Sequence, residues 1–313
     1  MQIHHSISSF NLTEKPTVVT LGTFDGVHVG HKTIIDRLIT VAEQKNEESV
    51  ILTFHPHPRI VLQKGSNIKL LTVLEEKKEL LHKTGIDHLI IEPFTEAFSR
   101  LTAVDFVRNI LVNKLHLNTL VIGYDHHFGR NREGNFEQLE ELSKLYGFDV
   151  IEIPAKDIKN IAVSSTKIRN ALNEGNIVKA NNYLGYNYLL TGEIIHGKGL
   201  GQQYNYPTVN IKIDYKGKLI PKAGVYIVKT NIDKKTVFGI MNIGFRPTID
   251  GKQQTIEVHL LDFNGNLYGK IIQVAVLYRL RDEQKFKNLE TLFSQIKNDE
   301  AKARELLQQN IVK

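Results

Sequence analysis

The pattern of apolar residues changes near residue 185, and this change constrains the fold more than any other feature of the chain. Before it, short β-branched or apolar runs alternate with helix-like stretches; after it, strand-like runs follow one another with only turns between them. Alternating strands and helices predict a parallel sheet with crossovers, whereas many short strands predict an antiparallel barrel. We therefore expect an α/β domain over residues 1–184 and a barrel domain over residues 185–313.

The first half carries candidate strands that are separated by candidate helices. The strands are expected at 17–21, 50–54, 88–91, 119–122 and 149–153, and helices at 74–83, 103–114 and 136–146. Crossovers between parallel strands are right-handed, and ligands bind such sheets at the carboxyl ends of the strands. Functional residues of this half should therefore directly follow its strands.

The second half carries strand-like runs between residues 188 and 280. These runs are YLLTGEII, YPTVNIKI, GVYIVKT, TVFGIMNIG, QQTIEVHLL and YGKIIQVAVLY. A final stretch, LETLFSQIKNDEAKARELLQQ, has the apolar spacing of an amphipathic helix. The expected architecture is an antiparallel β-barrel with a terminal helix.

Composition excludes several kinds of chemistry. The chain has 313 residues and no cysteine, which excludes disulfides, thiolate zinc sites and a cysteine nucleophile. No signal-peptide pattern and no apolar run approaching the roughly 20 residues of a membrane span is visible, which favours a cytoplasmic protein without a membrane partner. The net charge of +6 is spread along the chain. Without a helix-turn-helix signature, no nucleic acid partner is expected.

The stretch LGTFDGVHVGH, at residues 21–31, follows the first expected strand and precedes a helix-like stretch. A strand, a glycine-rich turn and a helix N-terminus form a generic anion site, because backbone N–H groups and the helix dipole face the ligand. His28 and His31 could donate hydrogen bonds to phosphate oxygens there. Two alternatives are a metal site, which needs a third ligand, and surface histidines without a function.

Three further segments follow later strands at the same expected edge of the sheet. SSTKIR, at 164–169, opens a helix-like stretch, and its serines are suited to N-capping. Lys167 and Arg169 are disfavoured in a first helical turn, unless a bound polyphosphate offsets the helix dipole. GYDHHFGRNREGN, at 123–135, suits a binding loop, and TFHPHP, at 53–58, is interpreted as a rigid structural loop.

The second half carries a glycine-rich segment, GKGLGQQYNYPTVN, at residues 197–210. Its glycines permit a tight loop that is suited to phosphate contact. Thr208 and Asn210 alternate on the next strand, so both oxygens point to one face, and such oxygens suit magnesium. A plain hairpin loop would explain the same residues.

The four N-terminal segments together resemble the adenylyltransferase module of bacterial bifunctional FAD synthetases, within the wider HxGH nucleotidylyltransferase group. The resemblance covers most of residues 15–180 and implies a Rossmann-like parallel sheet. It implies that His28 and His31 hold the phosphates of ATP and stabilise the transition state. The other nucleotide contacts assigned to this module are Gly22, Thr23, Phe24, Gly30, Asp125, Ser164, Ser165, Thr166 and Arg169.

PTVN, AGVY, MNIGFRPT and EVHLLDFNGNLYG, within 206–269, resemble the riboflavin kinase module of the same enzymes. The resemblance implies that Thr208 and Asn210 ligate magnesium, and that Glu257 is the general base on the riboflavin 5′-hydroxyl. The family usually has PTAN where this chain has PTVN, arginine in place of Gln202 and glycine in place of Asn205. The remaining nucleotide and flavin contacts assigned here are Gly197, Lys198, Gly201, Asn242, Gly244, Arg279 and Arg281.

The resemblance implies a bifunctional enzyme of flavin cofactor biosynthesis. A riboflavin kinase domain at 185–313 would convert riboflavin and Mg-ATP to FMN and ADP. An FMN adenylyltransferase domain at 1–184 would transfer AMP from a second ATP to FMN, giving FAD and pyrophosphate. Two alternatives are a chain with one active module, the kinase being in question because of Gln202, and a flavin-binding regulator without turnover. The sequence assigns no oligomeric state.

Overall fold

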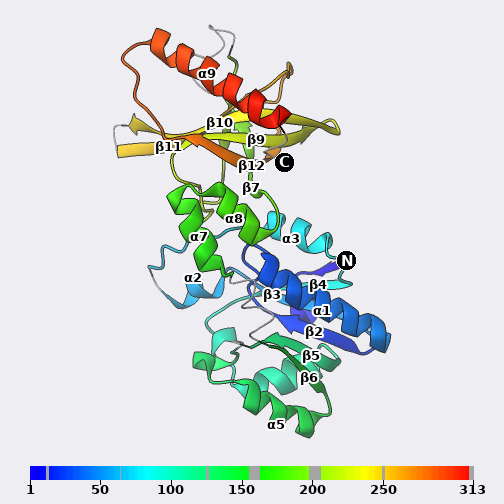
Figure 1. Ribbon diagram of the computed structural model, residues 1–313. Coiled ribbons are helices and arrows are strands. Elements are labelled where there is room, and N and C mark those ends of the chain that lie inside the picture. The colour runs from blue at the N-terminus through cyan, green and yellow to red at the C-terminus, as the bar shows by residue number, and fades with distance from the viewer. Residues whose placement is uncertain are drawn as a thin grey trace. The chain divides into compact units, whose positions relative to one another are not determined.

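The chain divides into two compact units, Met1–Ser165 and Thr166–Lys313. The computed structural model drawn in Figure 1 describes residues 1–11, 14–63, 65–124, 127–154, 163–196, 206–248 and 251–309. Helices α7 (Ser165–Glu174) and α8 (Ile177–Leu184) fall at and after this division. Hydrogen bonds join them to the barrel that follows: Lys222 N donates to Leu172 O, and Asn181 Nδ2 donates to Val276 O. A domain boundary after residue 184 stays a prediction.

The first unit is built on a six-stranded parallel sheet in the order β1–β4–β3–β2–β5–β6, which confirms the fold class expected for this half. Five of the six strands follow runs identified in the sequence. The sixth, β1, is an edge strand of three residues, too short for a period to be recognised. The strands are β1 (Gln2–His4), β2 (Thr17–Leu21), β3 (Glu48–His55), β4 (His88–Pro93), β5 (Leu117–Gly123) and β6 (Asp149–Ile153).

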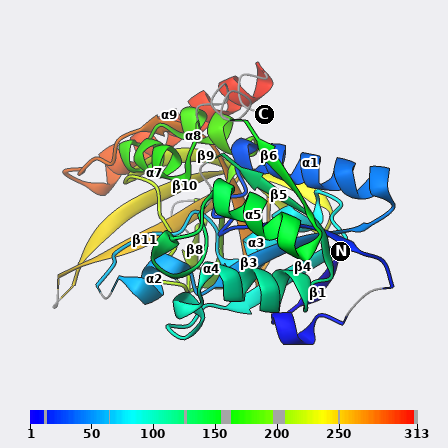
Figure 2. The same cartoon turned by 90° about the horizontal axis from the view of Figure 1, so that it is seen from below.

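Helices cover both faces of this sheet. Successive strand residues point to opposite sides, and because both sets are apolar, both faces are buried. Val18 and Ile51 lie in one buried cluster with side chains of α1 and α3. Val19 and Leu52 lie in the other, with side chains of α4, η3 and α5. Figure 1 shows α1 along the sheet, and Figure 2, seen from below, shows α4 and α5 in front of it. The elements are α1 (Val29–Lys45), α2 (Pro58–Leu62), α3 (Leu74–His82), α4 (Ala103–Asp105), η3 (Phe106–Val112) and α5 (Phe136–Tyr146), with short 3₁₀ turns η1 (Ile7–Ser9), η2 (Phe98–Arg100) and η4 (Arg130–Arg132).

The helix expected at 103–114 differs in kind from the observed structure. It begins as a single α-helical turn, α4, and continues as the π-helix η3. A π-helix adds a residue to the helical turn. Four residues of η3 are nevertheless buried against the sheet, so the apolar spacing located the element correctly although it did not give the helix type.

The second unit contains a closed antiparallel barrel in the order β10–β11–β8–β7–β12–β9, as expected. Every pair in it is antiparallel. Helix α9 (Leu289–Gln308) follows the barrel and packs its Ala303 against Val225, Ile227 and Ile240 of the outer barrel face. The strands are β7 (Tyr188–Ile195), β8 (Val209–Lys212), β9 (Gly224–Ile232), β10 (Lys235–Thr248), β11 (Gly251–Leu260) and β12 (Ile271–Arg281).

Candidate active sites

The turn between β2 and α1, residues 22–28, has an unusual backbone. Phe24, Gly26 and Val27 have φ angles of +45°, +86° and +36°, the left-handed region that non-glycine residues rarely adopt. Gly22 makes room for this turn, because a Cβ there would lie 3.3 Å from the Phe24 ring. Strained backbone of this kind persists only where the surrounding structure holds it, and it is common at functional sites.

Asp25 holds the turn to the segment that precedes α3. Its side chain is 2% exposed, and its Oδ1 accepts hydrogen bonds from the backbone N–H groups of Leu71 and Thr72, at 2.9 and 3.2 Å. The Thr72 hydroxyl in turn accepts from Gly26 N at 3.2 Å. The Ser165 hydroxyl donates to Asp25 O at 3.0 Å. The turn is thus fixed by groups from two other parts of the first unit.

His28 and His31 meet at the N-terminus of α1. His28 is the N-cap, and its Nδ1 accepts a hydrogen bond from His31 N at 3.3 Å. The neutral His28 ring therefore carries its proton on Nε2, which is suited to donate to a phosphate oxygen. The two rings stack with centroids 3.6 Å apart, and the Phe24 ring packs edge-on against His31 at 5.2 Å. Gly30, which is buried, lies between the two histidines in the first turn of α1.

Lys77, on α3, lies against the same turn. Its side chain is almost fully buried, and its Nζ donates to Thr23 O at 2.7 Å, beside a 3.3 Å hydrogen bond from the Thr53 hydroxyl to the same oxygen. Burial lowers the pKa of Lys77 to about 8, although the nearby Asp25 charge opposes this change. The lysine is therefore mostly protonated at neutral pH.

Burial, the neighbouring His28 and the charge of Lys77 hold the pKa of His31 well below its usual range. The Nδ1 of His31 is buried and, among the described residues, has no hydrogen-bond partner. Two stacked imidazolium rings would repel each other at this distance. His31 is therefore expected to be neutral at neutral pH. In that state its ring does not place a positive charge against the stacked ring of His28.

The other residues assigned to this site are placed as follows. Ser164 is exposed, and Ser165 begins α7. Thr166 and Arg169 lie on α7 in the second compact unit. Asp125 lies outside the described residues. Within the described residues, no three histidine or acidic side chains form a group that could hold a metal ion, so the metal alternative for the two histidines gains no third ligand.

In the barrel, strand register brings together residues that are far apart in the sequence. Asn210 of β8 pairs with Glu257 of β11, and Glu257 pairs on its other side with Asn242 of β10. Directly paired residues point to the same face of a sheet. This row of three polar side chains continues to Val225, which packs beneath α9, so the row lies on the outer barrel face that α9 also covers.

Thr208 precedes β8 and lies two residues from Asn210, on the same face of the extended chain. The hydroxyl of Thr208, the amide oxygen of Asn210 and the carboxylate of Glu257 are hard oxygen donors, and this donor set fits Mg²⁺, which binds proteins through few groups. His259 Nδ1 donates to Pro207 O at 2.9 Å, and the Tyr206 ring lies 5.2 Å from the His259 ring. β11 therefore fixes the segment that carries Thr208.

Arg279 and Arg281, which were assigned to ligands, have protein partners. Arg279 donates to Ala223 O and to Asp282 Oδ1, at 2.8 and 2.7 Å. Arg281 forms a bidentate pair with Asp299 of α9, at 2.7–3.0 Å. Gly244 faces the Glu283 carboxylate, which a Cβ on this glycine would meet. Gly197, Lys198 and Gly201, with Gln202 and Asn205, lie outside the described residues.

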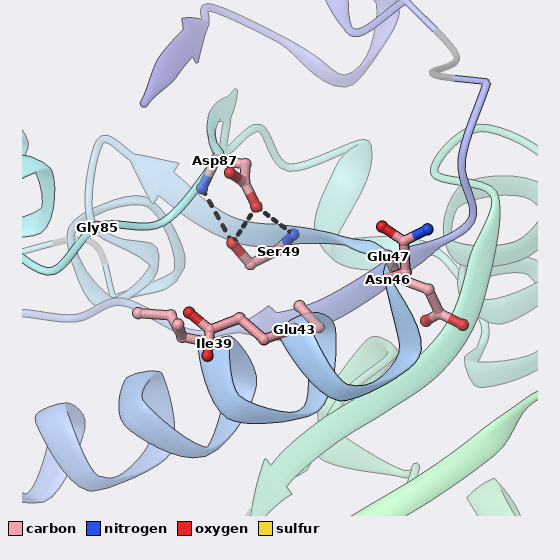
Figure 3. Close-up of a pocket in the computed structure, with 8 residues that line it drawn as sticks. Ile39, Glu43, Asn46, Glu47, Ser49, Gly85 and Asp87 are labelled. Atoms are coloured by element: carbon pink, nitrogen blue, oxygen red, sulfur yellow. Dashed lines mark hydrogen bonds between the residues drawn. The ribbon is translucent and has the colours of Figure 1, made fainter.

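A cavity of about 250 Å³ lies elsewhere in the first unit, near the C-terminal end of α1. Figure 3 shows its Ser49 and Asp87 joined by hydrogen bonds, of which the Asp87 carboxylate accepts two from Ser49, at 2.7 and 2.9 Å. Since His28 and His31 lie at the opposite end of α1, this cavity is separate from the turn at residues 22–28. It is lined by Ile39, Ala42, Glu43, Asn46, Glu47, Ser49, Gly85 and Asp87.

Comparison with known proteins assigns both units. The FAD synthetase family model matches residues 11–167, and the riboflavin kinase family model matches residues 184–307. A bifunctional riboflavin kinase/FMN adenylyltransferase from Listeria monocytogenes is 37% identical over 304 residues, covering 96% of each chain. Its counterpart from Escherichia coli is 36% identical over 94% of this chain and 95% of that protein.

The chain belongs to the bifunctional riboflavin kinase/FMN adenylyltransferase family. As a member, it is an enzyme that makes FMN from riboflavin and FAD from FMN, using ATP. The His28 turn lies within the FAD synthetase match, and the Glu257 row within the riboflavin kinase match. The bifunctional enzyme expected from the sequence is thereby confirmed, and the regulator without turnover is not supported.

The fold of this chain also matches a crystal structure described as a macrolide-efflux protein from Streptococcus pneumoniae. The TM-score is 0.86 at 28% identity, over 97% of this chain and 98% of the pneumococcal one. In the described part of the present chain, no helix has both the length and the apolar character needed to cross a membrane. The efflux description concerns the pneumococcal protein.

Two residues at these sites had not been singled out from sequence as functional. Lys77 sits three residues after Leu74 and four before Leu81, so it occupies the apolar face of α3, and this spacing was a readable signal. His259 is two residues from Glu257, and its hydrogen bond to Pro207 O makes it a polar partner of the segment that carries Thr208.

Proposed function

We propose that the two activities reside at two separate sites of the chain, the His28 turn for adenylyl transfer and the Glu257 row for riboflavin phosphorylation. The observation that carries this proposal is the presence of two polar constellations, one in each compact unit, within two different family matches. Each constellation has the groups that its reaction needs. The domain boundary proposed with these sites is residue 184.

At the first site, the proposed reaction is attack of the FMN phosphate oxygen on the α-phosphorus of ATP, with pyrophosphate leaving. The nucleophile is already ionised, so no side-chain base is needed, and catalysis depends on position and charge stabilisation. His28 Nε2–H, His31 and the first N–H groups of α1 are the proposed donors to ATP phosphates. The remaining proposed contacts are Gly22, Thr23, Phe24, Gly30, Asp125, Ser164, Ser165, Thr166 and Arg169.

At the second site, Glu257 is the proposed general base that accepts the proton of the riboflavin 5′-hydroxyl as its oxygen attacks the γ-phosphorus of ATP. Thr208 and Asn210 are the proposed ligands of Mg²⁺, which when bound would neutralise charge on phosphate oxygens. Glu257 is held opposite Asn210 by strand pairing, which supports a common role. The remaining proposed contacts are Gly197, Lys198, Gly201, Asn242, Gly244, Arg279 and Arg281.

The proposed ligands are riboflavin, FMN, FAD and ATP, without a nucleic acid or membrane partner. Because both reactions consume ATP, the cytoplasm is the proposed location. Riboflavin phosphorylation comes first, since the second reaction needs the FMN phosphate as its nucleophile.

A crossed pair of variants tests the two-site proposal. The enzyme is incubated with riboflavin, ATP and magnesium, and FMN and FAD are followed by chromatography. His28→Ala should lower the rate of FAD formation by a factor of about 10² or more, because one donor to the phosphates is lost. FMN should accumulate in this variant. Glu257→Ala should abolish FMN formation but still convert supplied FMN to FAD. Loss of both activities in either variant would contradict separate sites.

A further inference from the structure

Lys77 is a buried cation that the adenylyl-transfer scheme above does not use. It lies on α3, outside the four segments 21–31, 53–58, 123–135 and 164–169 that carry the resemblance to the adenylyltransferase module, and only 7% of its surface is exposed. Leaving an ammonium group in such a place costs free energy unless the group is compensated. Its neighbour Lys78, by contrast, forms a 2.6 Å ion pair with the largely exposed Glu75.

The contacts of Lys77 lead to the phosphate turn. Among the described residues, the single hydrogen bond of its ammonium group goes to Thr23 O, at 2.7 Å. That carbonyl directly precedes Phe24, whose φ of +45° begins the left-handed part of the turn. The Thr53 hydroxyl of β3 reaches the same oxygen at 3.3 Å, so the Thr23 peptide is held from α3 and from the sheet.

The charge of Lys77 also reaches the histidines of the site. It lowers the pKa of His31 on α1, after burial and His28, and it lowers the pKa of His55 at the end of β3, after burial. The acidic group that faces Lys77 is Asp25, on the turn itself. Since the pKa values of both histidines are lowered, Lys77 is the group here that offsets the Asp25 carboxylate, so the turn does not present an uncompensated negative charge to an anion.

We propose that Lys77 is a positioning residue of the adenylyltransferase: its ammonium group holds the Thr23 peptide and offsets the Asp25 carboxylate, so that the turn can take the phosphates of ATP. An ammonium group carries three donor protons, of which the Thr23 carbonyl takes one. A triphosphate at the turn would stabilise the charged form of the lysine, so ATP binding and protonation of Lys77 favour each other. The inference rests on the assignment of the His28 turn to ATP.

The experiment compares Lys77→Met, Lys77→Gln and Lys78→Met in the full chain. Methionine fills a similar volume without a charge, glutamine keeps a donor without a charge, and Lys78→Met removes a cation from the next position of the same helix. FAD formation from FMN and ATP is measured between about pH 6.5 and 9.5. Riboflavin phosphorylation and thermal unfolding of the same preparations report whether the chain is folded.

In the unaltered enzyme, kcat/KM for ATP should decrease as the pH rises past the Lys77 pKa of about 8, which gives the pH profile an alkaline limb. Both Lys77 variants should lose about tenfold or more in kcat/KM for ATP, chiefly through KM, and should lose this alkaline limb. Their riboflavin phosphorylation, and every property of Lys78→Met, should match the unaltered enzyme. A purely structural lysine would not give the enzyme a pH limb that disappears with it.

The inference would be overturned if either Lys77 variant is folded and forms FAD with the kcat/KM of the unaltered enzyme and with the same fall at alkaline pH. His28→Ala, assayed in parallel, separates the two levels of the argument. If His28→Ala keeps its FAD-forming activity, the assignment of the turn to ATP is wrong. If His28→Ala is inactive and the Lys77 variants behave as wild type, the assignment of the turn to ATP is supported and only the role proposed for Lys77 is wrong.

Discussion

The two proposed sites are built in different ways. The two histidines proposed for adenylyl transfer lie on one continuous stretch, 22–31, where a strained turn and a helix N-terminus bring them into a stacked pair. The proposed kinase residues Asn210 and Glu257 lie on different strands, far apart in the sequence, and they meet through strand pairing. A local site depends on the groups that hold its turn, whereas a site made by register depends on the whole barrel.

The largest effect that distinguishes the two sites is expected for the stability of the barrel. Arg281 and Asp299 join β12 to α9, and their side chains are 18% and 7% exposed. Asp299→Asn should destabilise the second unit by about 3 kcal/mol, because it leaves a nearly buried guanidinium without its carboxylate. Urea denaturation, followed through riboflavin phosphorylation, measures this change.

The control is Asp262→Asn, which alters a comparable bidentate pair with Arg304 that is mostly exposed. Exposed pairs contribute under about 1 kcal/mol. Equal stability of the two variants would show that Arg281 does not depend on Asp299, and would leave its guanidinium available for the ligand contact proposed from sequence.

The next effect concerns the proposed metal donors of the kinase. Asn210→Leu keeps the size of a side chain that is 8% exposed but removes its amide oxygen. Riboflavin phosphorylation should fall by about 100-fold and should require more Mg²⁺, because fewer groups hold the ion against the phosphates. FAD formation from supplied FMN, measured in the same preparation, should be unchanged. An unaltered magnesium requirement would remove Asn210 from the proposed ligand set.

The fold was largely predictable from the sequence, because its signals are local. The run at 17–21 and the helix at 136–146 have the observed bounds: the first is a short β-branched and apolar run that is buried throughout, and the second has apolar residues at helical spacing. The phosphate turn was equally visible, because its glycines and histidines are adjacent in the chain. What the sequence did not provide was the edge strand β1, which has three residues and no period.

The support behind each site was not predictable, for two physical reasons. Lys77 and Lys78 are adjacent lysines of one helix, and only packing decides that the first is buried at Thr23 O while the second pairs with Glu75. In the barrel, a shift of one residue in register would turn Glu257 to the opposite face, so its place opposite Asn210 depends on pairings across the sheet.

A smaller effect tests whether riboflavin phosphorylation depends on the exact position of β8 in the barrel. Gly192 of β7 lies where a Cβ would overlap the backbone carbonyl of Lys212, on the strand that carries Asn210. Gly192→Ala should cost about 1–3 kcal/mol of stability and lower riboflavin phosphorylation, because β8 must shift. Glu193→Ala, one residue further on, is the matched control. Kinetics identical to wild type in Gly192→Ala would mean that the Asn210–Glu257 row tolerates displacement.

The smallest effect concerns acid stability of the first unit, where the edge strand β1 is held by histidines. His4 Nε2 lies 3.1 Å from His88 Nδ1, and His88 Nε2 lies 3.0 Å from Glu48 Oε2. Burial, followed by the charge of His88, lowers the pKa of His4 below 6.5. Protonation therefore favours the unfolded chain, so the contribution of His4 is complete above about pH 6.5 and is lost as the pH falls below it.

His4→Gln should accordingly show a smaller fall in unfolding temperature between about pH 7.5 and 5.5 than the unaltered chain does. His31 and His55, whose pKa values are lowered in the same direction, retain most of the acid sensitivity, so the difference should be a few degrees at most. His5→Gln, at the exposed neighbouring position, should keep most of the pH dependence, because the charge of His5 is the smallest of the causes that lower the pKa of His4. An equal pH dependence in His4→Gln and the unaltered chain would place acid sensitivity entirely at the phosphate turn, which would make the local site the weaker of the two designs in acid.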